Sequence, residues 1–367
     1  MSHRVKGAAN KRWARAAALL PTVTLVAALL GAVCSGGDNI EPEEGTEAPA
    51  APQIDAPFGD LTPDATRALG VPGLSVYSVG GDLQLEQDGD LRKLVVAPEL
   101  NITYLSPRIS PDGRQVVYAR FTTGANVTSD IHITNLNGES RIVRQPSGEA
   151  EFFWTPQWSP DGASLVYAHQ RNKTDAEGRA FQIDVERIEL ANGQFEILVE
   201  NAQEPALSPN GRLLVFVDDP AIDQKLSVLD LETGEQTLLL DESDGLAVFR
   251  LPQFSPDGEW IAVLASGDGQ TLSSAPDLPA FARSNGVQDI WLIRPDGNGL
   301  RRLTNLREDQ PDIAWSSDGR HILLRGTFGV YIAEVETRTT QTILVPGEFH
   351  GTHDWRGALP IEAAVEP

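Results

Sequence analysis

A short motif recurs five times along this chain of 367 residues, and it constrains the fold more than any other feature. The copies read PRISPDG at 107–113, PQWSPDG at 156–162, PALSPNG at 205–211, PQFSPDG at 252–258 and AWSSDG at 314–319. Their serine, acid or amide, and glycine are Ser110, Asp112 and Gly113; Ser159, Asp161 and Gly162; Ser208, Asn210 and Gly211; Ser255, Asp257 and Gly258; and Ser316, Asp318 and Gly319. Successive serines are 47 to 61 residues apart, a spacing typical of propeller blades.

The motif has the composition of a tight turn. Proline sets φ for the first turn position, Asp or Asn tolerates the second, and glycine adopts the left-handed conformation that reverses the chain. The third, fourth and fifth positions after each glycine are apolar, which indicates a strand covered on both faces. Each copy therefore predicts a strand, a tight turn and a second strand, in sheets that stack face to face around an axis.

The second half of each repeat predicts another hairpin, so that one repeat makes a four-stranded blade. These hairpins cover residues 130–145, 185–200, 226–241, 289–304 and 329–345. The residue before each turn serine is large and apolar, and we expect it to pack between neighbouring blades. These residues are Ile109, Trp158, Leu207, Phe254 and Trp315.

A sixth blade is expected from the two ends of the repeat region. Residues 74–97 supply three strands without an SPDG-type turn, and HDWRG at 353–357 places Trp355 where the other repeats carry their packing residue. Closing the ring with strands from both ends removes exposed sheet edges. The sequence therefore predicts an all-β fold, a six-bladed β-propeller over residues 70–358, whose last blade is closed by N- and C-terminal strands.

Residues 1–34 predict a signal peptide or a membrane anchor. Five basic residues and no acidic ones precede an apolar run at 16–33, which places the rest of the chain outside the cytoplasm. Cys34 follows this run directly, where a bacterial lipoprotein carries its lipidated thiol. The alternatives are lipidation of Cys34, an uncleaved membrane helix and ordinary signal cleavage. We expect an extracytoplasmic protein of the bacterial cell envelope that contacts the membrane by its N-terminal anchor only.

The parts flanking the propeller are expected to be unstructured. Residues 35–69 combine prolines and carboxylates with few large apolar side chains, which predicts a disordered, extended linker, and residues 359–367 are a C-terminal tail. The whole chain has a formal net charge of −23, although its first 34 residues are basic. So acidic a protein repels phosphate backbones and anionic lipids, which argues against nucleic-acid binding. We expect another envelope protein or a peptide as partner, with an oligosaccharide as the alternative.

The five SPDG-type turns, each preceded by a packing residue and followed by apolar strands, resemble the WD-like repeats of the TolB propeller family. The resemblance covers about four fifths of the chain. It implies the propeller only, because residues 35–69 are too short and too polar for the α/β domain that precedes it in TolB. The repeats also resemble the propeller of prolyl oligopeptidases, but the sequence contains no G-x-S-x-G nucleophile elbow. We therefore expect no serine peptidase activity.

Chemistry-bearing residues outside the repeat are few. His350, His353 and Asp354 occupy the loop that enters the last inner strand, and we expect them near the rim of the central channel. Oligogalacturonate lyases, which share this type of repeat, bind a divalent metal near that position. Two histidines do not make a complete site, so no metal and no cofactor are expected. The sequence favours a non-catalytic binding or scaffold protein. The alternatives are a channel-mouth, metal-dependent lyase or hydrolase acting on oligosaccharides, and an accessory subunit of an exported membrane complex.

Overall fold

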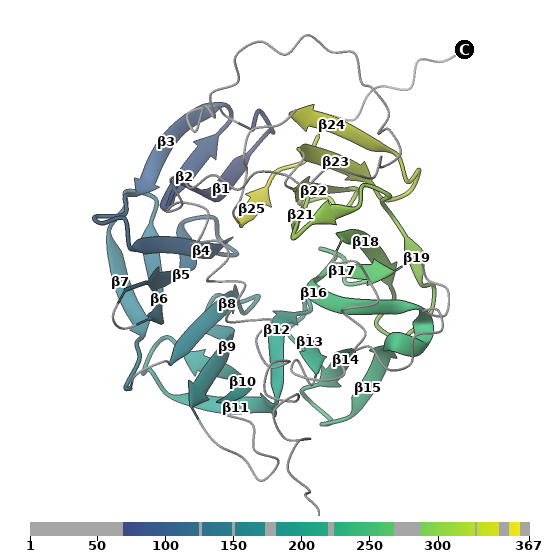
Figure 1. The fold of residues 1–367 in the computed structure, drawn as a ribbon, viewed down its shortest axis with the longest axis horizontal. Helices are drawn as coiled ribbons and strands as arrows, with labels where there is room; N and C mark the ends of the chain where they lie inside the picture. The colour runs from purple at the N-terminus through teal and green to yellow at the C-terminus, as the bar shows by residue number, and fades with distance from the viewer. Residues whose placement is uncertain are drawn as a thin grey trace, which may run out of the picture. The chain divides into compact units, whose positions relative to one another are not determined.

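The computed structural model describes residues 69–124, 127–148, 151–172, 181–218, 224–267, 287–326, 329–344 and 352–359. These residues form six antiparallel sheets arranged in a ring, with the innermost strand of each sheet nearest the central axis (Figure 1). The predicted all-β, six-bladed propeller is confirmed. Its one described helix is a short 3-10 turn, Glu242–Asp244 (η2), and no helix in the described ranges is long and apolar enough to cross a membrane. Cys34 and residues 35–68 of the predicted linker lie outside the described residues, whereas Leu69, its last residue, is buried in the core of the propeller.

Five blades are built from consecutive strands, ordered from the axis outward. Blade 2 has β4 (Ile102–Ile109), β5 (Gln115–Thr122), β6 (Thr128–Asn135) and β7 (Ser140–Arg144). Blade 3 has β8 (Phe152–Trp158), β9 (Ser164–Asn172), β10 (Phe181–Glu189) and β11 (Phe195–Glu200). Blade 4 has β12 (Ala202–Leu207), β13 (Leu213–Asp218), β14 (Lys225–Asp230) and β15 (Gln236–Leu240). Blade 5 has β16 (Leu246–Phe254), β17 (Ile261–Gly267), β18 (Val287–Ile293) and β19 (Arg301–Arg302), with β20 (Glu308–Asp309) also paired to β18. Blade 6 has β21 (Asp312–Trp315), β22 (His321–Arg325), β23 (Val330–Glu334) and β24 (Thr340–Leu344).

Blade 1 is assembled from both ends of the propeller. Its outer three strands are β1 (Leu74–Val79), β2 (Asp82–Gln87) and β3 (Asp90–Val95), and its innermost strand is β25 (His353–Arg356). Strand β25 pairs antiparallel with β1, so that Ser75 lies opposite Trp355. It also contacts the inner strands of the two neighbouring blades, β21 and β4. The closure predicted from residues 74–97 and 353–357 is therefore the closure in the structure.

The five SPDG-type turns share one hydrogen-bonded geometry. Each serine hydroxyl donates to the Asp or Asn two residues later, at 2.5 to 2.7 Å, and accepts from the amide five residues later, at 2.8 to 3.0 Å. The turn glycines have φ between 69° and 76°, which other residues adopt only with strain. Four of these glycines face a turn proline of the preceding blade: Gly162 faces Pro111, Gly211 faces Pro160, Gly258 faces Pro209 and Gly319 faces Pro256. The turns therefore stand side by side on one face of the ring, here called the turn face.

The core of the propeller lies in the seams between blades. Six clusters of buried apolar residues occur, and each joins the facing strands of two adjacent blades. The residue before each turn packs into a seam, and three of these are tryptophans whose indole N–H donates to a backbone carbonyl: Trp158 to Arg108, Trp315 to Gln253 and Trp355 to Pro72. Burial of both sheet faces explains why the second strand of every repeat is apolar at consecutive positions.

Candidate functional site

The inner strands of blades 2 to 5 share an irregularity four residues before the turn serine. There Ser106, Thr155, Glu204 and Leu251 have φ of 52°, 46°, 54° and 47°, and a proline follows each of them. The pairing with the second strand shifts register at the same places. Positive φ costs an L-residue on the order of 1 kcal/mol, and a bulge redirects the side chains around it. The irregularity therefore changes the direction of the side chains at this point of each inner strand.

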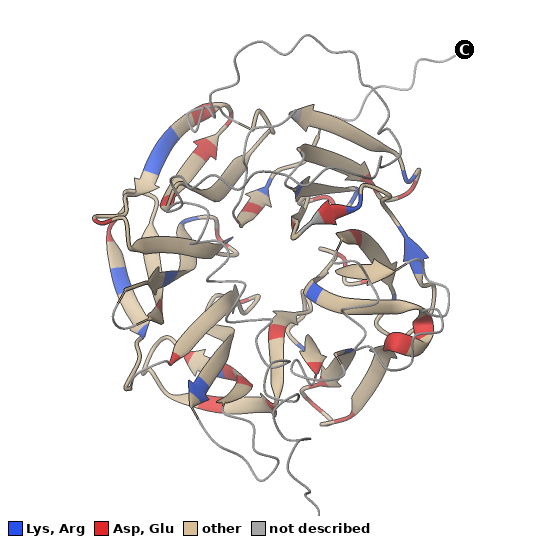
Figure 2. Cartoon of the chain, in the orientation of Figure 1, with Lys and Arg blue, Asp and Glu red and all other residues tan. Residues whose placement is uncertain are grey.

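Charged side chains from five blades meet around the axis, and we call this group the axial cluster. It consists of Arg108 on β4, Glu204 on β12, Arg250 on β16, Asp312 on β21 and His353 on β25. All but Arg250 are at least nine-tenths buried. Residues of both signs colour the strands nearest the axis in Figure 2. Because neighbours in the cluster come from different sheets, the cluster exists only in the closed ring.

Asp312 and His353 form the centre of the contacts in this cluster. The imidazole Nδ1 of His353 lies 2.9 Å from Asp312 Oδ2, and the backbone N–H of His353 donates to the same oxygen. The guanidinium of Arg108 donates to the carbonyl of His353 at 2.7 Å and to that of Pro107 at 2.8 Å. Burial acts to raise the pKa of Asp312, but His353 and Arg108 outweigh it and hold that pKa below its usual range. Asp312 is therefore a buried carboxylate kept ionised by its neighbours.

The pKa of Glu204 is shifted in the opposite direction from that of Asp312. Burial raises the pKa of its carboxyl, and Asp312 adds to the increase, whereas Arg250, the amide of Leu251 and Arg108 act against it. Its hydrogen bond from the Leu251 amide is 3.3 Å long. Glu204, Arg108 and Asp312 belong to blades 4, 2 and 6, which are not adjacent in the ring. Their mutual influence therefore acts across the axis.

The residues of the axial cluster and Thr155 on β8 are here called the axial wall. Several polar atoms of this wall lack a hydrogen-bond partner within the described part of the chain. They are Nη2 of Arg108, Nη1 of Arg250, Oδ1 of Asp312, Nε2 of His353 and Oγ1 of Thr155. An unsatisfied buried polar group costs on the order of 1 to 3 kcal/mol, so natural proteins use few of them. Donors and acceptors both occur in this set. The wall is therefore suited to a ligand or water that presents both kinds of group.

His350, His353 and Asp354, which were predicted near the rim of the central channel, do not form one group among the described residues. His350 lies outside the described residues. His353 is fully buried on the axial side of the closing strand, deeper than a rim position, because β25 is inserted between the inner strands of blades 6 and 2. Asp354, next along β25, accepts a hydrogen bond from the amide of Ile109 at 2.7 Å and so ties the closing strand to blade 2.

Sequence reasoning missed Arg108, Glu204, Arg250 and Asp312. The repeat alignment held a signal for some of them, since four copies carry a proline three residues before the turn serine, where the register shift occurs. The residues beside that proline vary in charge from copy to copy. Variable residues at a fixed, irregular position are candidates for ligand contact, whereas uniform residues at regular positions are candidates for structure.

Blade 3 contains a second buried charge group, away from the axial cluster. His169 Nδ1 lies 2.7 Å from Glu186 Oε1, and its Nε2 lies 2.8 Å from Glu151 Oε1. Each ring nitrogen of His169 therefore faces a carboxylate oxygen. Tyr167 and Arg144 also donate to Glu186, and the Phe153 ring stacks on His169 at 4.3 Å. These partners satisfy the group internally, which indicates a structural ion network.

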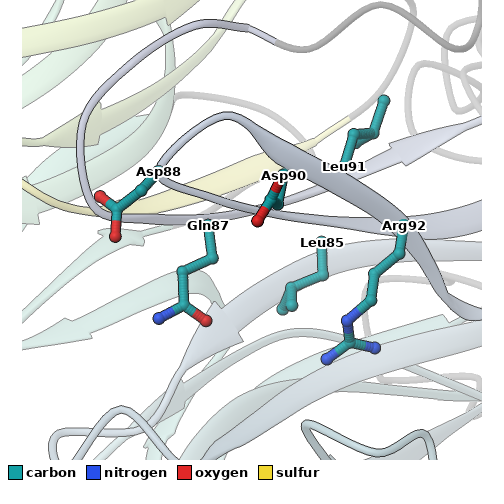
Figure 3. A pocket seen from close by; sticks show the side chains of 6 residues that line it. All are labelled: Leu85, Gln87, Asp88, Asp90, Leu91 and Arg92. Atoms are coloured by element: carbon teal, nitrogen blue, oxygen red, sulfur yellow. The ribbon is translucent and has the colours of Figure 1, made fainter.

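Two further features of the described residues bear on catalysis. A surface hollow is lined by residues of the β2–β3 hairpin of blade 1, including Gln87, Asp88, Asp90 and Arg92 (Figure 3). It belongs to the outer strands, so it is separate from the axial cluster.

In the described ranges, no group of three or more His, Cys, Asp or Glu side chains has the arrangement of a metal site.

Comparison with solved structures identifies the type of propeller. TolB from Acinetobacter baumannii superposes with a TM-score of 0.57 at 17% identity, over 77% of this chain and 66% of that chain. This chain has the TolB propeller fold. The resemblance of its repeats to TolB is therefore confirmed at the level of the fold. No family model matches the sequence.

Two curated relatives extend the comparison. This chain matches the Tol-Pal system protein TolB of Nitratidesulfovibrio vulgaris at 32% identity over 74 residues, 18% of this chain and 17% of that protein. It also matches the uncharacterized peptidase YuxL of Bacillus subtilis at 26% identity over 191 residues, 46% of this chain. The chain spans only 28% of the length of that peptidase. Sequence similarity thus extends both to a Tol-Pal protein and to a protein named as a peptidase, and it does not decide between binding and catalysis.

Proposed function

We propose that this protein is a non-catalytic, extracytoplasmic binding or scaffold protein of the bacterial cell envelope. The observation that carries the proposal is the axial cluster, in which five blades contribute charged or polar groups and some of their hydrogen-bonding atoms have no partner among the described residues. An extended peptide presents donors and acceptors along its backbone, so it complements such a wall. The basic and apolar N-terminal segment supports export to the envelope.

A catalytic role requires groups that the described residues do not bring together. Glycoside cleavage by carboxylates needs an acid and a base or nucleophile flanking the substrate, whereas Asp312 is occupied by His353 and Glu204 lies across the axis from it. A metal-dependent lyase needs additional ligands beside His353. The proposal of an enzyme acting on oligosaccharides is therefore the weaker of the two. Metal analysis of the purified protein separates them, because a lyase of this kind would retain about one divalent ion per chain.

The binding proposal is tested by photo-crosslinking in intact cells. A photoreactive residue placed at Arg250, which is only half buried in the axial wall, is expected to give a discrete crosslinked product. The matched control is Arg212, an exposed arginine paired with Asp230 at 2.7 Å in blade 4, where no product is expected. Equal products at both positions, or none at Arg250, would contradict binding at the axis.

A further inference from the structure

Arginines gather around Trp260 at the seam between blades 5 and 6. The guanidinium groups of Arg294 and Arg301 each lie 4.6 Å from the centre of the Trp260 ring. Trp260 follows the SPDG turn of blade 5, and both arginines belong to the β18–β19 hairpin of the same blade. Arg338 is in the β23–β24 turn of blade 6. These four residues, here called the arginine–tryptophan patch, lie at the end of the blades that carries the turn face.

The patch is held in place by packing. The Trp260 side chain is partly buried against the apolar cluster that joins blades 5 and 6. The hairpin backbone lies close to the ring, since a methyl group added at Gly299 would be 3.3 Å from Trp260 Cη2. Arg301 donates to the carbonyl of Val335 in blade 6 at 3.2 Å. The indole and Arg301 are therefore positioned before any ligand arrives, which lowers the entropic cost of binding.

The positive charge of the patch is only partly balanced by the protein. Among the described residues, no carboxylate lies within ion-pair distance of Arg294, Arg301 or Arg338. The pKa of Arg301 is lowered by burial and by the charges of Arg338 and Arg294. Asp296, in the same hairpin, accepts a hydrogen bond from the amide of Asn298 at 2.9 Å and interacts with the charge of Arg294 without forming an ion pair.

This lack of pairing contrasts with other surface arginines of the same chain. Arg187 pairs with Glu196, Arg212 with Asp230 and Arg302 with Asp289. The sequence holds 52 acidic residues against 29 basic ones, so carboxylates are abundant. Arg294 and Arg301 lie on one ring, and the charge of Arg338 acts on Arg301, so these arginines carry a repulsion that a bound anion would reduce.

We propose that the arginine–tryptophan patch binds a phosphate group of a small ligand. Several guanidinium groups can donate to the oxygens of one phosphate, whereas a single carboxylate satisfies one arginine and leaves the remaining charge uncompensated. A small ligand fits better than an extended polyanion, because the net charge of −23 repels a long chain of phosphates. The patch is independent of the axial cluster, so this proposal does not depend on the proposed function.

The test uses the purified full chain and inorganic phosphate as the probe. Phosphate is expected to raise the unfolding temperature in a saturable way, beyond the effect of chloride at equal ionic strength, since a ligand of the native state stabilises it. Arg338→Gln, at an exposed turn position, should weaken phosphate binding at least about tenfold, as should Arg301→Gln. Arg187→Gln is the matched control, because Arg187 is already paired with Glu196, and it should bind phosphate as the wild type does.

Three results would overturn the proposal. One is the absence of a saturable response to phosphate, and another is an equal response in wild type and Arg338→Gln. The third is a result showing that the patch binds the phosphate of a lipid headgroup and not that of a small ligand. Binding of wild type and of Arg338→Gln is therefore measured on vesicles of phosphatidylglycerol and of phosphatidylcholine. Both proteins carry the same N-terminal segment, so its contribution to vesicle binding is the same in each and does not affect the comparison. A loss of phosphatidylglycerol binding in the variant, without a response of the wild type to inorganic phosphate, would assign the patch to lipid instead.

Discussion

The turn face and the axial wall are built on the same inner strands, and they differ in almost every respect. At the turns, Ser159 and its counterparts repeat one hydrogen-bond pattern with nearly identical distances. Four residues earlier, the same strands carry Ser106, Thr155, Glu204 and Leu251 at an irregular backbone position. The side-chain atoms of the turns are satisfied within each blade, whereas atoms such as Arg108 Nη2 have no hydrogen-bond partner in the part of the chain that the structure describes. The residues at the five turns are alike, which indicates a structural role. The residues at the irregular position differ between blades, which leaves that part of the strand available for function.

The two regions also differ in how they are stabilised. A turn is local, so its loss affects one hairpin. The axial wall is shared, because Asp312 of blade 6 depends on His353 of the closing strand and on Arg108 of blade 2. Changes at the axis are therefore expected to have effects on stability that vary more in size and sign than those of changes at the turns.

Deletion of residues 350–367 should have the largest effect. It removes β25, exposes the edge of β1 and takes away Trp355 from its seam and His353 from Asp312. The loss should exceed the roughly 5 to 15 kcal/mol that stabilises an average domain, leaving no cooperative unfolding transition by calorimetry. Deletion of 360–367 alone is the control and should leave the transition in place. A cooperative transition at the wild-type temperature in the longer deletion would show that the ring closes without β25.

Asp312→Ala should be the most damaging single substitution of this series. The substitution removes the buried carboxylate that contacts His353. Removing one partner of such a buried contact lowers the free energy of unfolding by about 3 to 5 kcal/mol, which chemical denaturation measures. Because the pKa of Asp312 is lowered on folding, its contribution is present above the ordinary carboxyl pKa and is lost as pH falls through the lower folded value. The difference between wild type and variant should therefore shrink in acid. Asp296→Ala, at an exposed hairpin, should change stability by less than about 0.5 kcal/mol.

Ser255→Ala tests the turn face and should cost about 1 to 2 kcal/mol. The serine hydroxyl donates to Asp257 and accepts from the amide of Trp260, and alanine loses both bonds. Asp257→Asn is the matched control, since blade 4 has Asn210 at the same place with the same contacts. That change should stay within about 0.5 kcal/mol by thermal unfolding. A larger cost for Asp257→Asn than for Ser255→Ala would mean that the turn depends on charge.

Glu204→Gln should have the smallest effect and the opposite sign. The pKa of Glu204 is raised by burial, so the folded state disfavours the ionised form. The carboxyl therefore favours folding below the ordinary glutamate pKa, and this contribution is lost as pH rises through the raised folded value. The neutral amide avoids the loss, and we expect a gain of less than about 1 kcal/mol at pH 7 that disappears near pH 4. Destabilisation at pH 7 would show that Arg250 and Arg108 require the charge.

The repeat made most of the fold predictable from sequence. Spacing of the turn serines, the glycines with positive φ and the apolar strand positions are local signals, and each copy repeats them. The split blade was predictable for the same reason, since Trp355 sits in the packing column of the other repeats. The axial cluster was only partly predictable. Glu204 and Asp312 each lie four residues before a turn serine, but Arg108 and Arg250 occupy other positions of their repeats, and the sequence does not show that these charges meet.

The sequence by itself therefore determined the blades, their number and the way the ring closes, because turn chemistry and strand periodicity act over a few residues. Only the tertiary structure decided which charges meet. His353 is buried against Asp312 because the closing strand is inserted between blades 6 and 2, and Glu204 senses Arg108 because the ring brings blades 4 and 2 to a shared axis. Arg338 acts on Arg301 for the same reason, across the seam between blades 5 and 6. Charge interactions act through space at distances set by the closed ring, so no local pattern in the chain encodes them.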